Sequence, residues 1–193
     1  MAIIRGVTID HATLQRWVIR FVRLIDKEVR RRKKSVGSSW RMDETYIKVK
    51  GVWMYLYRAV DSAGYTIDFL LRKNRDASAA KAFFGKAIKH NGSPQKVTID
   101  KSGSNSCALS SLNKSLAKEK QIEIRQIKYL NNIVEQDHRF IKKRTKPMLG
   151  FKSFNSAKIT ITGIENIRMI QKGQIIGGNN KLSVFENFAM LMT

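Results

Sequence analysis

Three strand-like segments follow one another between residues 40 and 73 with only short turns between them. They are residues 40–51, 52–61 and 65–73, and Gly51 and the run Ser62-Ala63-Gly64 separate them. Strands joined by such short turns pair antiparallel, so this stretch predicts a three-stranded meander. The run VWMYLYRAVD at 52–61 is the most apolar of the three, which favours a position inside the sheet.

The rest of the chain alternates between helical and strand-like patterns. Short apolar strands are expected at 95–100 and 122–127, and helices at 77–90, 105–120, 130–144 and 153–173. Crossover connections through helices would add the two later strands to the meander. The order therefore predicts an α/β fold with a mixed five-stranded sheet flanked by helices.

The beginning of the chain predicts one amphipathic helix over residues 11–30. Asp10 is a suitable N-cap, because its carboxylate can accept a backbone N–H from the first turn. Apolar side chains recur at helical spacing, namely Leu14, Trp17, Val18, Phe21, Val22 and Ile25. The cluster of five basic residues at 30–34 and the loose run SVGSS then indicate a linker over about 31–39.

Charge is the strongest compositional constraint on the partner. Lysine and arginine number 37 against 15 aspartate and glutamate, a net charge of +22, and such a surplus favours nucleic acid. Cys107 is the single cysteine, which excludes an intramolecular disulfide and a cysteine zinc site and fits a reducing cytoplasm. The sequence shows neither a signal-peptide pattern nor an apolar run of membrane-spanning length, so no membrane role is expected.

Three carboxylates stand at the edges of apolar segments, where a fold can bring them together. Asp43 lies in the first strand, Asp100 ends the fourth, and Glu135 lies in the helix at 130–144. Asp43 and Asp100 would be neighbours if their strands are adjacent. A few carboxylates are the usual protein ligands of Mg²⁺, and two such ions can serve phosphoryl transfer. Lys142 follows Glu135 by two helical turns and would contact the DNA backbone.

Each of these residues also has a structural interpretation. Acids at strand ends are common, as Asp61 and Asp68 illustrate, and most are solvated or cap a turn. Glu44 is adjacent to Asp43 but faces the other side of a strand. For His138, one turn from Glu135, a surface position is the default expectation. The case for a site rests on the conjunction of the three acids, their spacing and the positive charge.

Several of these segments together resemble the integrase core of bacterial DDE transposases of the insertion-sequence "six" family. The segments are MDETYIKVKGVWMYLYRAVDSAGYTIDFLL, TIDKSGSN, IKYLNNIVEQDHRFIKKR and LGFKSFNSAKITITGIENIRMIQKG. The resemblance covers about residues 7–175. It implies an RNase-H-like fold and DNA strand cleavage and joining with two Mg²⁺ ions, for which Mn²⁺ can substitute. It also implies that the catalytic and metal-binding acids are Asp43, Asp100 and Glu135.

The resemblance extends to partners and to the division of the chain. It implies double-stranded DNA as substrate, at element ends and target, and a homodimer or higher oligomer on DNA, in the bacterial cytoplasm with the nucleoid. The expected DNA contacts are Lys142, His138, Arg139, Arg16 and Arg20. The expected parts are a remnant of a helix-turn-helix domain (1–30), a basic linker (31–39), the catalytic domain (40–175) and a C-terminal tail (176–193).

Two departures from the family keep alternatives open. The helix that should precede the recognition helix is missing, which would leave Leu14, Trp17 and Phe21 partly unburied. The run SGSNSCALSS after Asp100 stands where family members often carry an Ala-Pro pair. The alternatives are a truncated, non-catalytic DNA-binding remnant that inhibits full-length transposase, and an RNase-H-like nuclease acting on RNA–DNA hybrids.

Overall fold

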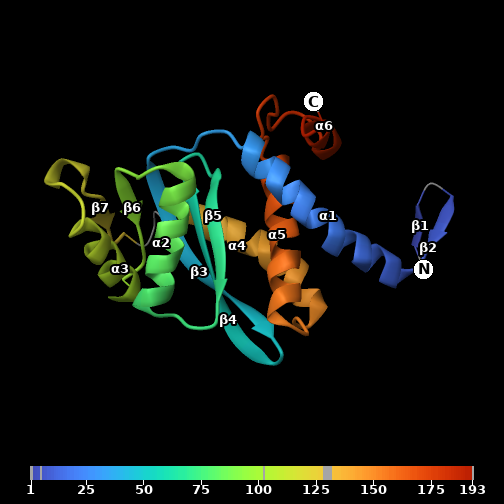
Figure 1. Cartoon of the computed structure of the whole chain (residues 1–193), viewed down its shortest axis with the longest axis horizontal. Helices are drawn as coiled ribbons and strands as arrows, with labels where there is room; N and C mark the ends of the chain where they lie inside the picture. The colour runs from blue at the N-terminus through green and yellow to red at the C-terminus, as the bar shows by residue number, and fades with distance from the viewer. Residues whose placement is uncertain (1, 5, 102, 128–131, 193) are drawn as a thin grey trace. The chain divides into compact units, whose positions relative to one another are not determined.

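The computed structural model describes residues 2–4, 6–101, 103–127 and 132–192 (Figure 1). The chain forms two compact units. One is Ser35–Gly150, and the other combines Met1–Lys34 with Phe151–Thr193. The predicted sheet belongs to the first unit.

The sheet has five strands in the order β5-β4-β3-β6-β7, which confirms the predicted mixed sheet. The antiparallel meander consists of β3 (Ser39–Val49), β4 (Val52–Asp61) and β5 (Thr66–Arg72). The turn between β3 and β4 uses Lys50 and Gly51, both at positive φ, as a two-residue hairpin turn requires. β4 is an interior strand, as its apolar sequence indicated, although β3 holds the middle position.

The two later strands join the sheet in parallel on the far side of β3. They are β6 (Lys96–Thr98) and β7 (Glu123–Arg125). In the β3–β6 ladder Arg41 pairs with Thr98 as the last partners. Asp43 and Asp100 therefore each lie two residues beyond the same pair, because parallel strands advance together from a shared register. The first and fourth strands are thus adjacent, which is the condition under which Asp43 and Asp100 were expected to be neighbours.

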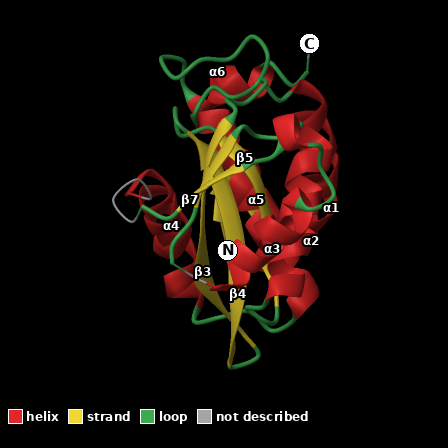
Figure 2. Ribbon diagram, turned by 90° about the vertical axis from the view of Figure 1, so that its left-hand side faces the viewer, coloured by secondary structure: helices red, strands yellow, loops and turns green. Residues whose placement is uncertain are grey.

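Helices cover both faces of this sheet (Figure 2). α2 (Ala77–Asn91) and α3 (Gly103–Asn113) pack on one face, and α4 (Asn132–Thr145) lies on the other. Between the sheet and the first two helices lies the main core, which includes Trp40, Met42, Tyr57, Phe83, Phe84, Val97 and Leu109, each at most 1% exposed. Trp40 and Met42 therefore mark the face of β3 that packs against α2 and α3.

One helix ends well before its predicted boundary. The helix expected over 105–120 ends at Asn113, whose side chain accepts from Ile122 N and donates to Ile122 O, both at 2.8 Å. These bonds turn the chain toward β7, with only a short 3-10 helix at Lys118–Lys120 between. The helix expected from residue 130 is described from Asn132 on, and residues 130 and 131 lie outside the described part of the chain.

The described residues of the other unit form three helices and a hairpin. They are β1 (Ala2–Ile4), β2 (Val7–Ile9), α1 (His11–Arg32), α5 (Phe154–Gln171) and α6 (Val184–Ala189). The long N-terminal helix and its Asp10 cap are confirmed, with Asp10 accepting from Ala12 N at 3.1 Å. The hairpin was not predicted from the sequence, and α6 lies within residues 176–193, which were expected to be a C-terminal tail. A capping box of Ser183 and Glu186 starts α6.

Close packing of α1 on α5 builds this second unit. Gly163 brings the helices together, since a Cβ there would lie 3.0 Å from Val22 Cγ2. Val29 is fully buried with Met169, Ile170 and Ile175. Trp17 and Phe21, by contrast, are about half exposed, at 46% and 45%.

The boundaries of the two units are not those of the four parts expected from the sequence. The unit that contains the C-terminal residues also contains α1 and α5, which pack on each other. The roles assigned to residues 1–30, 31–39, 40–175 and 176–193 stay a prediction. Within the described ranges, no helix is both long and apolar enough to cross a bilayer.

Candidate active site

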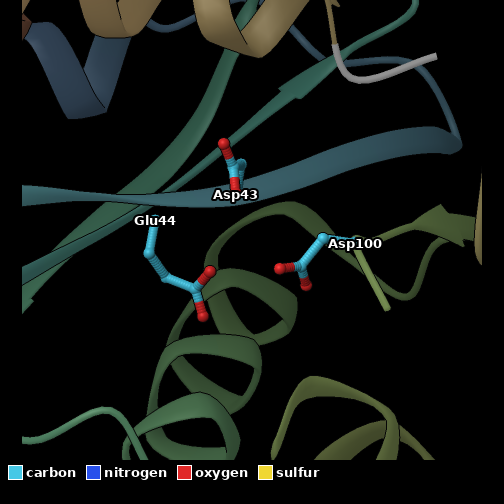
Figure 3. Close-up of side chains that lie close together, drawn as sticks. All are labelled: Asp43, Glu44 and Asp100. Atoms are coloured by element: carbon cyan, nitrogen blue, oxygen red, sulfur yellow. The ribbon is translucent and has the colours of Figure 1, made fainter. Parts of the chain in front are cut away.

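Asp43 and Asp100 approach each other at the edge of β3. One carboxylate oxygen from each of Asp43, Glu44 and Asp100 lies within 4.8 Å of the others (Figure 3). The register of β3 and β6 accounts for this, since both aspartates follow the last pair by two residues. Oxygen atoms at this spacing from three carboxylates suit a divalent cation such as Mg²⁺.

Glu44 lies on the opposite side of β3 from Asp43, as strand alternation predicted (Figure 3). Its side chain is only 4% exposed, and burial raises the pKa of its carboxyl, with the nearby acids adding to the rise. Two partners oppose that rise. Asn105 donates to Glu44 at 3.0 Å, and the Arg75 guanidinium donates at 3.3 Å.

Arg75 and Asn105 also bind Asp100. Arg75 Nη2 donates to Asp100 Oδ2 at 2.9 Å, and Asn105 Nδ2 donates to Oδ1 at 3.4 Å. Asp100 and Glu44 thus share the same two donors, which fixes the Asp100 carboxylate beside Asp43. Neither donor was predicted, because nothing in the local sequence around a loop arginine or a helical asparagine indicates such long-range pairing.

Asp43 faces a pocket formed with α4. The other lining residues are Glu44, Thr45, Tyr46, Glu135, His138, Arg139 and Lys142. The four from α4 recur at intervals of three, one and three, so they share one helix face. Glu135, Arg139 and Lys142 are exposed to solvent there. The predicted placement of Lys142 on the same face as Glu135 agrees with this pocket.

The surface position expected for His138 is wrong. Its side chain is 6% exposed, and Nε2 lies 3.3 Å from Asp43 Oδ2, within ion-pair range. Neither ring nitrogen makes a geometrically aligned hydrogen bond within the described residues. The reason for its burial is the helical period, which turns His138 with its buried neighbours Val134 and Ile141 toward the sheet.

Glu135 lines the pocket with Asp43 but does not belong to the cluster that lies within 4.8 Å. The donor set therefore divides into two aspartates that already lie together and one glutamate on the adjoining helix. Such a set of hard oxygen donors fits divalent metal binding.

A buried ion pair connects α4 to β4 behind these acids. Arg58, directly opposite Asp43 in the β3–β4 register, is 1% exposed, and its Nη2 lies 3.4 Å from Asp137 Oδ2. Strand partners opposite each other share a face, so Arg58 and Asp43 both look toward α4. This pair was not predicted, since Asp137 is one of several charged residues on a basic helix.

Asp61 and Asp68 have structural roles, as the competing interpretation held. Asp61 accepts from Ala63 N and Tyr65 N at 2.9 Å and from Gly37 N at 2.8 Å. Asp68 binds Lys86 Nζ at 2.7 Å. Neither belongs to the cluster around Asp43.

Sequence comparison accounts for this arrangement of acids. A family profile described as a DDE domain matches residues 37–174, which include all three candidate acids. The chain belongs to the DDE domain family. The transposase for insertion sequence-like element IS431mec of Staphylococcus aureus is 42% identical over 168 residues, covering 87% of this chain and 73% of that protein. The transposase for insertion sequence element IS257 in transposon Tn4003, also from Staphylococcus aureus, matches with the same values. These relatives place the chain in the insertion-sequence "six" family of transposases.

Solved structures show the same fold. The catalytic core domain of BIV integrase has a TM-score of 0.51 and 17% identity, covering 79% of this chain and 94% of that one. The HTLV-2 integrase catalytic core domain in complex with magnesium (trimeric form) has a TM-score of 0.50 and 15% identity, covering 81% and 99%. The predicted RNase-H-like, integrase-core fold of this DDE-family chain is confirmed.

Proposed function

We propose that this DDE-family chain cleaves DNA strands at the ends of an insertion sequence and joins them to target DNA, using Asp43, Asp100 and Glu135 as metal-binding catalytic acids. The observation that carries the proposal is the approach of Asp43 to Asp100 beside a pocket that Glu135 also lines. Arg16 and Arg20, exposed on α1, are proposed DNA contacts.

The proposed chemistry is in-line displacement at phosphorus. The oxygen of water, and later of a DNA 3′-hydroxyl, forms a new P–O bond while the P–O bond to the leaving strand breaks and that oxygen takes up the proton. Two bound Mg²⁺ ions, or Mn²⁺ in their place, would supply Lewis-acid stabilisation of the attacking and leaving oxygens. Asp43 would hold the ions together with Asp100 and Glu135, because it lies beside Asp100 and lines the same pocket as Glu135.

The residues around the acids would orient DNA. Arg139 and Lys142 stand exposed beside Glu135, where positive charge meets the phosphates on either side of the scissile bond. His138, held against Asp43 at 3.3 Å, would orient that carboxylate and reach DNA only at the pocket floor. The net charge of +22 supports binding of double-stranded DNA at the element end and at the target.

Joining two element ends to one target requires two active sites in one assembly. We therefore include a homodimer or higher oligomer on DNA in the proposal, working with the nucleoid in the bacterial cytoplasm.

The deciding experiment measures metal-dependent nicking and strand transfer on a labelled duplex that carries the element end. Asp43→Asn should abolish both reactions, while DNA affinity stays equal or rises, because a carboxylate that repels phosphate is removed. Glu123→Gln is the matched control, since it makes the same charge change at an exposed acid on β7 and should leave cleavage unaffected.

The outcomes separate the proposal from its main alternative. Cleavage that survives in Asp43→Asn would refute the assignment of the acids. DNA binding without cleavage in the unaltered chain would favour a non-catalytic remnant that competes with full-length transposase for DNA.

A further inference from the structure

Beyond the acids, the hairpin of β3 and β4 exposes large aromatic side chains. Trp53 is 57% exposed and Tyr46 is 50% exposed, although both belong to strands of the main sheet. Tyr46 also lines the pocket that contains Asp43 and Glu135. Exposed apolar surface that borders a pocket often marks a site of interaction with a ligand or partner.

The register places these rings on one face. Tyr46 is opposite Tyr55, and Lys48 is opposite Trp53, and partners opposite each other project from the same side of the sheet. The centroids of Tyr46 and Tyr55 lie 5.3 Å apart, and those of Tyr46 and Trp53 lie 6.4 Å apart. We call Tyr46, Trp53 and Tyr55 the aromatic platform.

Cations lie within and beside the aromatic platform. Lys48 Nζ lies 5.8 Å from the centre of the Trp53 ring. Arg72 of β5 is exposed and stands opposite Tyr55, so it borders the same face. Glu44, two residues before Tyr46, also projects from this face and connects it to Asp100 through Arg75. The platform therefore begins beside Glu44, on the face of β3 opposite to Asp43, and runs toward the hairpin tip with positive charge along it.

This combination suits one class of ligand. A paired duplex presents phosphates and groove edges to a protein and keeps its base faces stacked on each other. An unpaired strand offers base faces to aromatic rings and phosphates to nearby cations, and that pairing is how single-stranded nucleic acid is bound. Tyr46 lies three residues from Asp43, roughly 10 Å along the strand, and its side chain projects from the opposite face of β3. It still lines the pocket that contains Asp43, so a base stacked on it would be within a few nucleotides of the scissile phosphate.

We propose that the aromatic platform stacks unpaired DNA bases next to the cleavage site, so that the enzyme acts on a strand end whose last base pairs have opened. This inference rests on the proposed function, because it assigns to the aromatic platform the strand that the acids cut. The same rings also stabilise the hairpin as cross-strand pairs, and the experiment has to separate the two roles.

The test compares the affinity of the full chain for oligo(dT) and for a blunt duplex at one salt concentration, in EDTA so that no strand is cut. Trp53→Leu and Tyr46→Leu keep an apolar side chain on the hairpin and remove the ring. Each should weaken oligo(dT) binding by about 5- to 100-fold, as the loss of one stacked base predicts, and change duplex binding by less than about twofold.

Val52→Ala is the matched control for damage to the hairpin. Val52 is 61% exposed on the same hairpin but projects from the opposite face to Trp53, so its truncation should leave both affinities unchanged. Thermal unfolding of each variant shows whether the hairpin has been disturbed. Equal loss on oligo(dT) and duplex, or no loss on either, would overturn the proposal.

Tryptophan fluorescence gives a second readout. The chain has three tryptophans, and Trp40 is only 1% exposed, so DNA cannot contact its ring. In a Trp17→Phe variant, a change of tryptophan emission on DNA binding therefore comes mainly from Trp53. Stacking should quench this emission with oligo(dT) and not with duplex. Unchanged emission on addition of oligo(dT) would overturn the proposal. A Trp53→Leu variant with altered oligomeric mass and unaltered DNA affinity would also overturn it, because the aromatic platform would then be an interface between copies of the chain.

The result also separates this inference from the proposed function. If Trp53→Leu and Tyr46→Leu leave the affinity for oligo(dT) unchanged in a chain whose cleavage depends on Asp43, the aromatic platform alone is refuted. A chain with neither DNA affinity nor cleavage would refute both.

Discussion

Arg75 is the residue whose chemistry most affects the candidate metal site. Its guanidinium bridges Glu44 at 3.3 Å and Asp100 at 2.9 Å, so a cation already compensates two of the clustered carboxylates. A divalent ion that binds Asp100 has to share or displace this contact. Arg75 thus positions Asp100 and at the same time competes with the metal.

Arg75→Ala should tighten Mn²⁺ binding, because the competing positive charge is removed. The guanidinium is 33% exposed, so we expect a modest gain of about two- to fivefold in affinity. Titration of Mn²⁺ by calorimetry measures it, with Arg75→Lys as the control that keeps the charge. Weaker binding in the alanine variant would show that positioning of Asp100 outweighs charge competition.

Lys142 tests the proposed phosphate contact on α4. Lys142→Gln should weaken duplex binding about equally for all sequences and reduce the slope of log affinity against log salt by about 0.9, the value for one phosphate contact. Lys143→Gln is its control, since Lys143 is equally charged and exposed but does not line the pocket. If the two variants show the same salt slope, Lys142 does not make the proposed phosphate contact at the site.

At the scale of elements, α4 carries two different sets of residues. One face presents Glu135, Arg139 and Lys142 to the pocket, while Val134 and Ile141 are buried against the sheet. The rotation of the helix about its axis decides whether Glu135 faces the metal site. The buried ion pair of Asp137 with Arg58 fixes that rotation from the side of β4.

Asp137→Asn should destabilise the fold by about 3 kcal/mol, because a buried arginine loses a charged partner. Denaturant unfolding measures the loss. The double variant Asp137→Asn, Arg58→Met removes both charges. It should regain part of the lost stability, since an apolar residue of similar length replaces the cation. If Asp137→Asn alone is as stable as the unaltered chain, contacts other than this ion pair set the position of α4.

For the whole molecule, the net charge of +22 dominates encounters with DNA. The acids of the candidate site are a small negative region within this positive molecule. Positive charge outside the site attracts the polyanion, and Arg75, Arg139 and Lys142 reduce the local repulsion close to the acids.

Non-specific duplex binding should therefore fall steeply with salt. If about six phosphates are contacted, log affinity falls against log salt with a slope of about −5. Filter binding or fluorescence anisotropy over a salt series measures this slope, and Asp43→Asn should show the same value. A slope near zero would contradict an electrostatic encounter.

Some of this structure could be predicted from local sequence. The meander at 40–73, the helix at 11–32 and the interior position of 52–61 follow from hydrophobic period and turn residues, because these signals act over a few residues. The hairpin of β1 and β2 and the end of α3 at Asn113 were not predicted. The second depends on hydrogen bonds from Asn113 to Ile122, a partner that comes nearby only when β7 has joined the sheet.

The amino-acid sequence alone determined the order of the five sheet strands and of the helices between residues 11 and 173, the positive charge and the three candidate acids with their family. The tertiary structure decided that Asp43 and Asp100 follow the same pair of the β3–β6 ladder, that His138 is buried against Asp43, and that Arg75 and Asn105 bind Asp100. The physical reason is range. Periodicity and capping are set by neighbours along the chain, whereas ion pairs and shared donors depend on residues tens of positions apart that meet only in the folded sheet.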